Sequence, residues 1–258
     1  MKKRNLFFIS AYLLFFTFSL NAQERITDEG EARAIFEEVD DRRNSIETET
    51  AVMTMVITDT RGRTRSRTLQ SWVQHSGDDT KNLIIFSDPG NVLGTAFLSL
   101  NEDGSQSQRL YLPSVGRIQT ISSAERGDRF MGSDFTYEDL GDQNPDDYEF
   151  EWFETNESSY TIRASKPDSD QYAYLEFEVT KETFALKTIR YFDDSDSMIK
   201  RLEAEDFEQI TDRLWSPRKM IMYDLREDRK TEITWSERQI NEPIEEWRFT
   251  ERGLMRGL

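Results

Sequence analysis

The sequence predicts a mainly β protein, built as one large antiparallel meander that curls into a barrel or half-barrel. From Thr50 onward apolar residues alternate with a period of two, which is the side-chain period of a strand. Turn signals such as Asp59–Gly62 and Asn101–Gly104 separate these segments, which follow one another about every 8 to 15 residues. A single amphipathic helix precedes them all.

That helix is expected from Thr27 to about Ser45. Thr27 can cap its N-terminus, and acidic residues in the first turn and arginines in the last suit the helix dipole. An apolar stripe runs along one side only, at Ala32, Ile35, Phe36 and Val39. The helix should therefore lie on the sheet by one face.

About eleven to thirteen strands are expected in the remaining chain. The segments run from Thr50 to the turn at Asp59 and then over 63–75, 80–87, 94–100, 108–112, 117–121, 148–155, 159–166, 172–180, 185–192, 198–209, 214–225 and 230–239. In Leu83–Phe86 and Ala96–Leu98 both strand faces are apolar, so something must cover each side of the sheet there. A short C-terminal helix from Glu245 is also expected.

The stretch Phe86–Gly141 departs from this regularity. It holds seven of the chain's 12 glycines, and its period breaks after residue 121. An open meander exposes its first and last strands, so it must close or be covered. We expect Ser122–Leu140 to form a short lid over one face of the sheet, together with the N-terminal helix.

Residues 1–22 have the pattern of a secretory signal peptide, with Lys2, Lys3 and Arg4 ahead of an apolar run from Leu6 to Leu20. As a helix this run would be only about 22 Å long, which is short for a bilayer core. Cleavage after Ala22 would leave residues 23–258 as a single domain. An uncleaved anchor is the alternative.

Composition excludes several classes of function. The net charge is −17, and removal of residues 1–22, with three basic and no acidic residues, takes it to −20, which argues against nucleic-acid binding. There is no cysteine, so the chain has neither disulfides nor the residue through which a bacterial lipoprotein is anchored. With His75 as the one histidine, no motif marks a catalytic site, a metal site or a cofactor site, and we expect no enzyme activity.

Other groups of residues have two interpretations. Arg61, Arg63, Arg65 and Arg67 alternate and should share a face that meets a lipid phosphate or a protein partner, or simply faces solvent. Met53 with Met55, and Met220 with Met222, share strand faces that belong either to the core or to an adaptable apolar cavity. The acidic segment 193–197 is a solvated turn or an ion site.

Three motifs resemble the outer-membrane lipoprotein-sorting protein family, the LolA-like periplasmic proteins. They are F-x-x-P-x-x-x-x-G-T-x-F-L at Phe86–Leu98, Y-L-P at Tyr111–Pro113 and FMGSDFTYEDL at Phe130–Leu140. The resemblance implies a half-open β-barrel with helices over its mouth, and a periplasmic carrier or chaperone that moves lipoproteins or other lipids toward the outer membrane. It brings no catalytic residues and no cofactor.

Within this family the motifs belong to a branch associated with RND-type (MMPL-like) inner-membrane exporters. The expected ligands are lipid or lipoprotein acyl chains, and the protein is expected to be a monomer without a membrane anchor. An accessory subunit that docks such an exporter without carrying lipid is the main alternative. An enzyme on the same barrel and a purely structural envelope protein are the others.

A carrier of this kind needs an apolar wall, since a C16 chain in water costs on the order of 12 kcal/mol at about 0.8 kcal/mol per methylene. The residues predicted to line its cavity are Met53, Met55, Phe97, Leu110, Leu112, Ile118, Phe130, Met131 and Phe135. Which strand face points inward is assumed here, because a register slip of one residue reverses it.

Overall fold

The computed structural model describes residues 24–169 and 171–257, and the expected signal peptide lies outside this part. The helices are α1 (Glu29–Arg43), α2 (Glu251–Arg256) and the short 3-10 turns η1 (Ser123–Glu125), η2 (Phe130–Gly132), η3 (Pro145–Asp147) and η4 (Glu246–Phe249). The strands are β1 (Glu24–Ile26), β2 (Thr48–Thr58), β3 (Thr64–Ser76), β4 (Asp79–Asp88), β5 (Ala96–Glu102), β6 (Ser105–Leu112), β7 (Arg117–Thr120), β8 (Glu149–Thr155), β9 (Ser159–Ser165), β10 (Tyr174–Thr180), β11 (Leu186–Phe192), β12 (Met198–Gln209), β13 (Trp215–Asp224) and β14 (Arg229–Ile240). No helix within the described ranges is long and apolar enough to cross a membrane.

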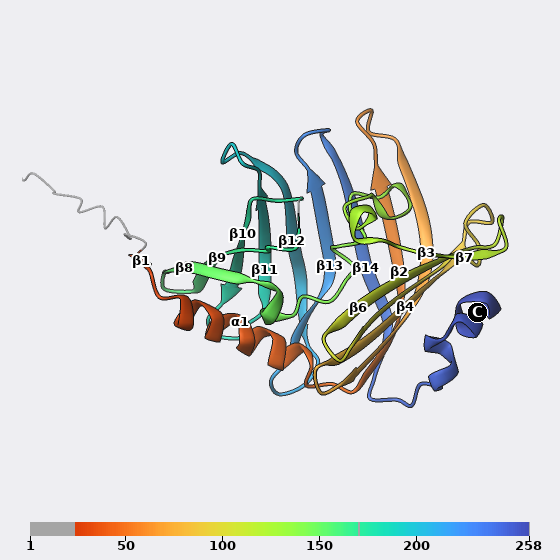
Figure 1. Cartoon of the computed structure of the whole chain (residues 1–258), viewed down its shortest axis with the longest axis horizontal. Coiled ribbons are helices and arrows are strands. Elements are labelled where there is room, and N and C mark those ends of the chain that lie inside the picture. The colour runs from red at the N-terminus through yellow and green to blue at the C-terminus, as the bar shows by residue number, and fades with distance from the viewer. Residues whose placement is uncertain (1–23, 170, 258) are drawn as a thin grey trace, which may run out of the picture.

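All the strands form one antiparallel sheet of 14 strands, in the order β1-β8-β9-β10-β11-β12-β13-β14-β2-β3-β4-β5-β6-β7. The predicted meander is thus two meanders, β2–β7 and β8–β14, joined where β14 pairs with β2. The sheet curves around one face without closing, which confirms the half-open barrel (Figure 1). Its edges, β1 and β7, are short, which limits the backbone available for pairing with another chain.

Every strand expected from the sequence is present, within a few residues of its expected bounds. Only β1 was not expected, because three residues carry too little pattern to recognise. The alternation in β2 fixes its register: Ala51, Met53, Met55 and Ile57 all point to the buried side. These residues face the concave side of the sheet, where the main core lies.

Helix α1 covers the β8–β10 end of the concave face, which we call the helix zone (Figure 1). It begins two residues later than expected, and Asp28 rather than Thr27 caps it, with Oδ1 accepting from the Glu31 N–H at 2.9 Å. Its apolar stripe is buried as predicted. The Phe36 ring lies with its centroid 4.8 Å from that of Phe177 and 5.5 Å from that of Tyr148.

The irregular segment between β7 and β8 covers the concave face of β2–β6, which we call the lid zone. Phe130 is fully buried there, with its ring centroid 5.3 Å from that of Phe97 and 5.7 Å from those of Phe86 and Tyr137. The lid turns sharply at Met131 and Gly132, which both have positive φ. The predicted lid insertion is confirmed.

The C-terminal segment, η4 and α2, covers the opposite, convex face of β4 and β5. Phe249 and Leu254 pack there in a second core with Leu83, Ile85 and Leu98. This second core explains why these two strands are apolar on both faces. The short helix predicted from Glu245 is therefore a structural cover for that face.

Candidate functional site

Between the helix zone and the lid zone, the concave face of β11–β14 and β2 borders a cavity of about 380 Å³. We call this region the cavity zone. Its sheet wall is mainly apolar and comprises Met53, Ile189, Tyr191, Leu202, Ala204, Met220, Met222, Ile233 and Trp235. Its other walls come from the end of α1, the lid and the β10–β11 turn, and include Val39, Phe135, Leu140 and Phe184.

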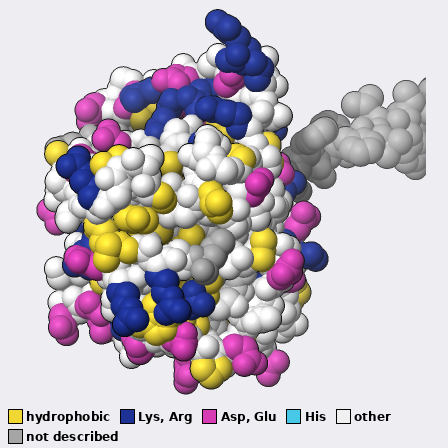
Figure 2. Space-filling view, turned by 90° about the vertical axis from the view of Figure 1, so that its right-hand side faces the viewer, with side chains coloured by type: hydrophobic (Ala, Val, Ile, Leu, Met, Phe, Trp, Pro, Cys, Tyr) yellow, Lys and Arg dark blue, Asp and Glu magenta, His cyan; other side chains and the backbone are white. Residues whose placement is uncertain are grey.

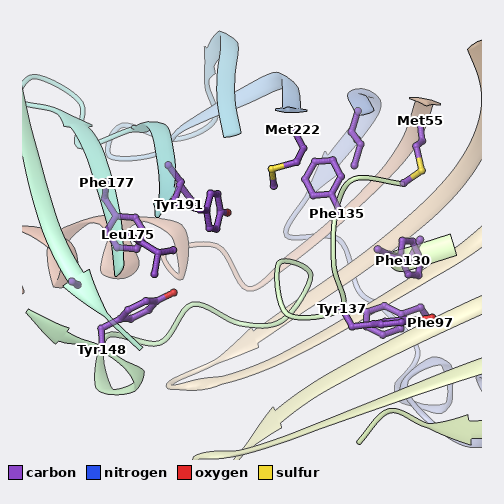
Figure 3. Close-up of a cluster of buried hydrophobic side chains, with 14 of the residues drawn as sticks. Met55, Phe97, Phe130, Phe135, Tyr137, Tyr148, Leu175, Phe177, Tyr191 and Met222 are labelled. Carbon is purple, nitrogen blue, oxygen red and sulfur yellow. The ribbon is translucent and has the colours of Figure 1, made fainter. Parts of the chain in front are cut away.

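Figure 3 shows how the three zones adjoin. Phe177, Leu175 and Tyr148 lie on the helix side, while Phe130, Tyr137 and Phe97 pack together on the lid side. Met222 and Phe135 lie between these groups, and both line the cavity. The methionine thioethers on this wall give it the adaptable surface that binding sites for flexible apolar ligands use.

A smaller polar chamber of about 220 Å³ adjoins the cavity at the end of the sheet where β3 finishes and β4 begins. The two share wall residues, among them Arg43, Glu49, Asn82 and Leu140. Oδ1 of Asn82 is buried and has no hydrogen-bond partner among the described residues. The site thus combines an apolar cavity with a polar end that offers a free acceptor.

His75 and Glu49 line the polar chamber, and burial disfavours the charged form of each. Burial, together with the charge of Arg43, lowers the pKa of His75 to about 4. Burial raises the pKa of Glu49, although its carboxylate lies 3.3 Å from Nε of Arg238. His75, at the end of β3, is half-buried in the chamber wall, which it shares with Arg43 of α1 and Leu140 of the lid.

The lid is fastened to the sheet by buried polar contacts. Asp139 forms an ion pair with Lys200 of β12, and Lys200 Nζ also donates to the Tyr172 hydroxyl at 2.9 Å. Both charged side chains are less than a tenth exposed. The same Asp139 carboxylate accepts from the backbone N–H of Thr136 at 2.6 Å. This explains the acidic residue near the end of the FMGSDFTYEDL motif.

Asp134 makes the second fastening. Its Oδ2 accepts from the Thr231 hydroxyl at 2.6 Å, and Oδ1 lies 3.2 Å from Nε of Arg229. Burial raises the pKa of this carboxyl group. Arg229 also donates to the carbonyl of Gly132 at 3.0 Å. The polar residues of the motif hold the lid on β12 and β14 and do not line the polar chamber.

The structure divides the residues predicted to line the cavity. Met53 and Phe135 lie on its wall. Met55, Phe97, Leu110 and Phe130 share the concave face but are at most 5% exposed and pack into the lid zone. Leu112 and Met131 lie partly buried against the same core. Ile118 lies on the convex side, in the second core under Phe249 and Leu254.

The predicted arginine patch is also divided. Arg61, Arg63 and Arg65 are exposed, and Arg63 pairs with Asp59. Arg67 is only 9% exposed and donates to the carbonyl of Met131 at 2.7 Å, so it belongs to the lid. Arg61 and Arg63 lie in the β2–β3 turn, whereas Arg67 lies in β3 on the concave face, where the lid covers it.

Sequence reasoning left out most of the sheet wall of the cavity, which β11–β14 supply. One signal pointed to it, namely the shared face of Met220 and Met222. The described residues contain no group of three or more acidic or histidine side chains suited to a metal ion.

A protein-family model described only as "uncharacterized protein" matches residues 78–256. Among solved structures, a domain named for outer membrane lipoprotein sorting, from Vibrio parahaemolyticus, is 25% identical with a TM-score of 0.82, and the match covers 88% of this chain and 100% of that one. A DUF1329 family protein from Desulfovibrio piger is 22% identical with a TM-score of 0.81, covering 89% and 100%. None of the curated proteins compared is significantly similar.

A LolA superfamily protein from Nitrosomonas europaea is 17% identical with a TM-score of 0.66, and the match covers 88% of this chain and 98% of that one. This likeness concerns the fold. Together with the lipoprotein-sorting domain, it confirms the LolA-like architecture suggested by the three sequence motifs.

Proposed function

The chain belongs to the family whose model matches residues 78–256 and has a LolA-like fold, and from this premise we propose that it carries a lipid or a lipoprotein acyl chain. The observation that carries the proposal is the apolar cavity of about 380 Å³ between two covers. That volume lies in the range of small-ligand sites, roughly 300–1,000 Å³. Each buried methylene contributes about 0.8 kcal/mol, which is the driving force a carrier needs.

In this proposal the polar chamber takes the head of the amphiphile. Asn82 offers an unpartnered acceptor, while burial raises the pKa of Glu49 and lowers the pKa of His75. A neutral head with hydroxyl or amide donors suits this environment, because it pairs the buried acceptor without burying a charge. The acyl chain then extends over the methionines of β13.

We further propose that the carrier is periplasmic, that it is secreted by cleavage after Ala22, and that it is not lipidated. The apolar leader and the absence of cysteine support this. The lipoprotein-sorting neighbour has a name consistent with it. The RND-type exporter stays a prediction from the sequence resemblance, and it is not needed for the carrier proposal.

Native mass spectrometry of protein purified from its own host tests the proposal. The expected result is about one bound amphiphile per chain. The polypeptide mass should correspond to a chain that begins at Gln23. Repeated preparations without an amphiphile, combined with failure to bind a fluorescent fatty acid, would contradict the carrier function. A mass that retains residues 1–22 would contradict only the cleavage.

A further inference from the structure

One side of the molecule combines exposed apolar residues with exposed arginines. The apolar residues are Leu93 in the β4–β5 loop, Val115 in the β6–β7 turn and Met255 in α2, each more than half exposed. The arginines are Arg61, Arg65, Arg117, Arg252 and Arg256, all exposed. We call these eight residues the basic-apolar face.

Three of the elements that carry this face, the β4–β5 loop, the β6–β7 turn and α2, are in contact through their neighbours. A Cβ at Gly94 would lie 3.3 Å from Cγ of Pro113, which places the β4–β5 loop against the β6–β7 turn. Helix α2 packs on β5–β7 through Leu254, in the same cluster as Ile118 of β7. Figure 2 looks at this side and shows hydrophobic side chains between two groups of Lys and Arg, with acidic residues mostly nearer the margins.

The arginines of this face differ from most others in the chain in that they form no ion pair with a described carboxylate. Across residues 24–169 and 171–257, most arginines have a carboxylate within 4.0 Å, as Arg25, Arg190 and Arg238 do. None of the five arginines of the face has one in those ranges; the nearby acids Asp59 and Glu251 pair with Arg63 and Arg109 instead. Unpaired cations on one side of a chain with a net charge of −17 indicate an anionic partner.

The same side offers groups that suit a membrane interface. Arg256 and Arg248 lie over the Trp247 ring, 4.7 Å and 5.2 Å from its centroid. Aromatic rings with an amphipathic character concentrate at the headgroup level of bilayers. Isolated apolar side chains on loop tips insert between headgroups, while flanking arginines meet lipid phosphates.

We propose that the basic-apolar face docks the protein reversibly on an anionic phospholipid surface. The chain's overall negative charge does not prevent this, because charges beyond a Debye length of about 8 Å are screened at physiological ionic strength. It instead orients the protein, since anionic lipids repel the acidic surface elsewhere. The acidic remainder keeps the docking weak. The proposal does not depend on the carrier function.

Co-sedimentation of the protein with vesicles tests this proposal. Vesicles of phosphatidylcholine with 30% phosphatidylglycerol, roughly the charge of an anionic leaflet, should bind the protein, whereas pure phosphatidylcholine should not. Binding should fall as salt rises from about 50 to about 300 mM, because a higher ionic strength shortens the Debye length and screens the attraction. Each arginine should contribute about five-fold to partitioning, so the triple variant R65Q/R117Q/R252Q should bind about 100-fold more weakly.

The matched control removes the same number of charges elsewhere, as K181Q/K187Q/R218Q, and should bind like the unaltered protein. The variant L93S/V115S/M255S should bind more weakly while keeping the salt dependence. The proposal is overturned if the unaltered protein does not co-sediment with anionic vesicles. It is also overturned if the control variant loses as much binding as the triple variant. Binding to an acidic polypeptide without vesicle binding would also overturn it, because the face would then serve a protein partner. Circular dichroism confirms that each variant is folded.

Discussion

The lid zone and the cavity zone are adjoining parts of one curved sheet. The first is closely packed under its cover, whereas the second borders a cavity. Over β2–β6 the lid inserts Phe130 between Phe86 and Phe97, and all three rings are fully buried. Over β11–β14 the lid is held by polar contacts to Lys200 and Thr231, and beside these contacts Met220, Met222 and Ile189 line a cavity. Strand composition alone does not separate the zones, because both present Met, Leu and Ile. What differs is the covering segment.

The largest loss of stability is expected when a buried aromatic side chain is removed from the lid zone. Phe130→Ala should lower the free energy of unfolding by about 4 kcal/mol, because it opens a hole in a packed aromatic cluster. Met220→Ala, on the cavity wall, should cost about 1 kcal/mol or less, since that side chain already borders free space. Urea denaturation of both variants measures the difference.

Equal losses in these two variants would contradict the contrast between the zones. A loss at Met220 as large as that at Phe130 would mean that the cavity zone is packed in solution. Phe130→Leu serves as the matched control, and it should recover most of the stability because it refills the space with an apolar group.

A smaller effect is expected from the fastening of the lid. Lys200→Met should lower the free energy of unfolding by about 3 kcal/mol, because Asp139 would remain buried without its partner. Hydrogen exchange should also become faster in residues 130–140 than in β2. Both effects are measurable on the same preparations by urea denaturation and exchange mass spectrometry.

Adding Asp139→Leu to Lys200→Met removes the unpaired charge and should restore part of the stability. If the double variant is less stable than Lys200→Met alone, the ion pair is not what holds the lid. The hydrogen bonds of Asp139 to Thr136 would then be the main contribution.

The fold was largely predictable because it follows from local patterns. The alternation at Ala51–Ile57, the apolar stripe of α1 and the two-sided strands β4 and β5 each have one structural solution. Even the lid was recognisable, since Phe130–Leu140 breaks the strand period while it carries Phe130, Phe135 and Tyr137. The order of the strands was not predictable, because the pairing of β14 with β2 joins residues nearly two hundred positions apart.

The site was predictable only in part, for a related reason. Alternation identifies the concave face, but it does not tell which part of that face the lid fills. Phe97 and Met53 both lie on the concave face, yet the first lies under Phe130 and the second lines the cavity. Ile118 lies opposite Tyr111 on the convex side, where the C-terminal helix covers it through a contact between distant segments.

The most direct measurement of the central claim is a fluorescent fatty acid titration of two tryptophan variants. Ala204 lies on the cavity wall, so Ala204→Trp fills the cavity; Glu205 is the next residue along β12 and points to the other face. We predict that Ala204→Trp weakens binding at least about 100-fold, which is the loss expected when a few methylene groups of the ligand are no longer buried. The variant Glu205→Trp should bind like the unaltered protein. Equal binding by both variants, with both folded, would contradict the assignment of the ligand to this cavity.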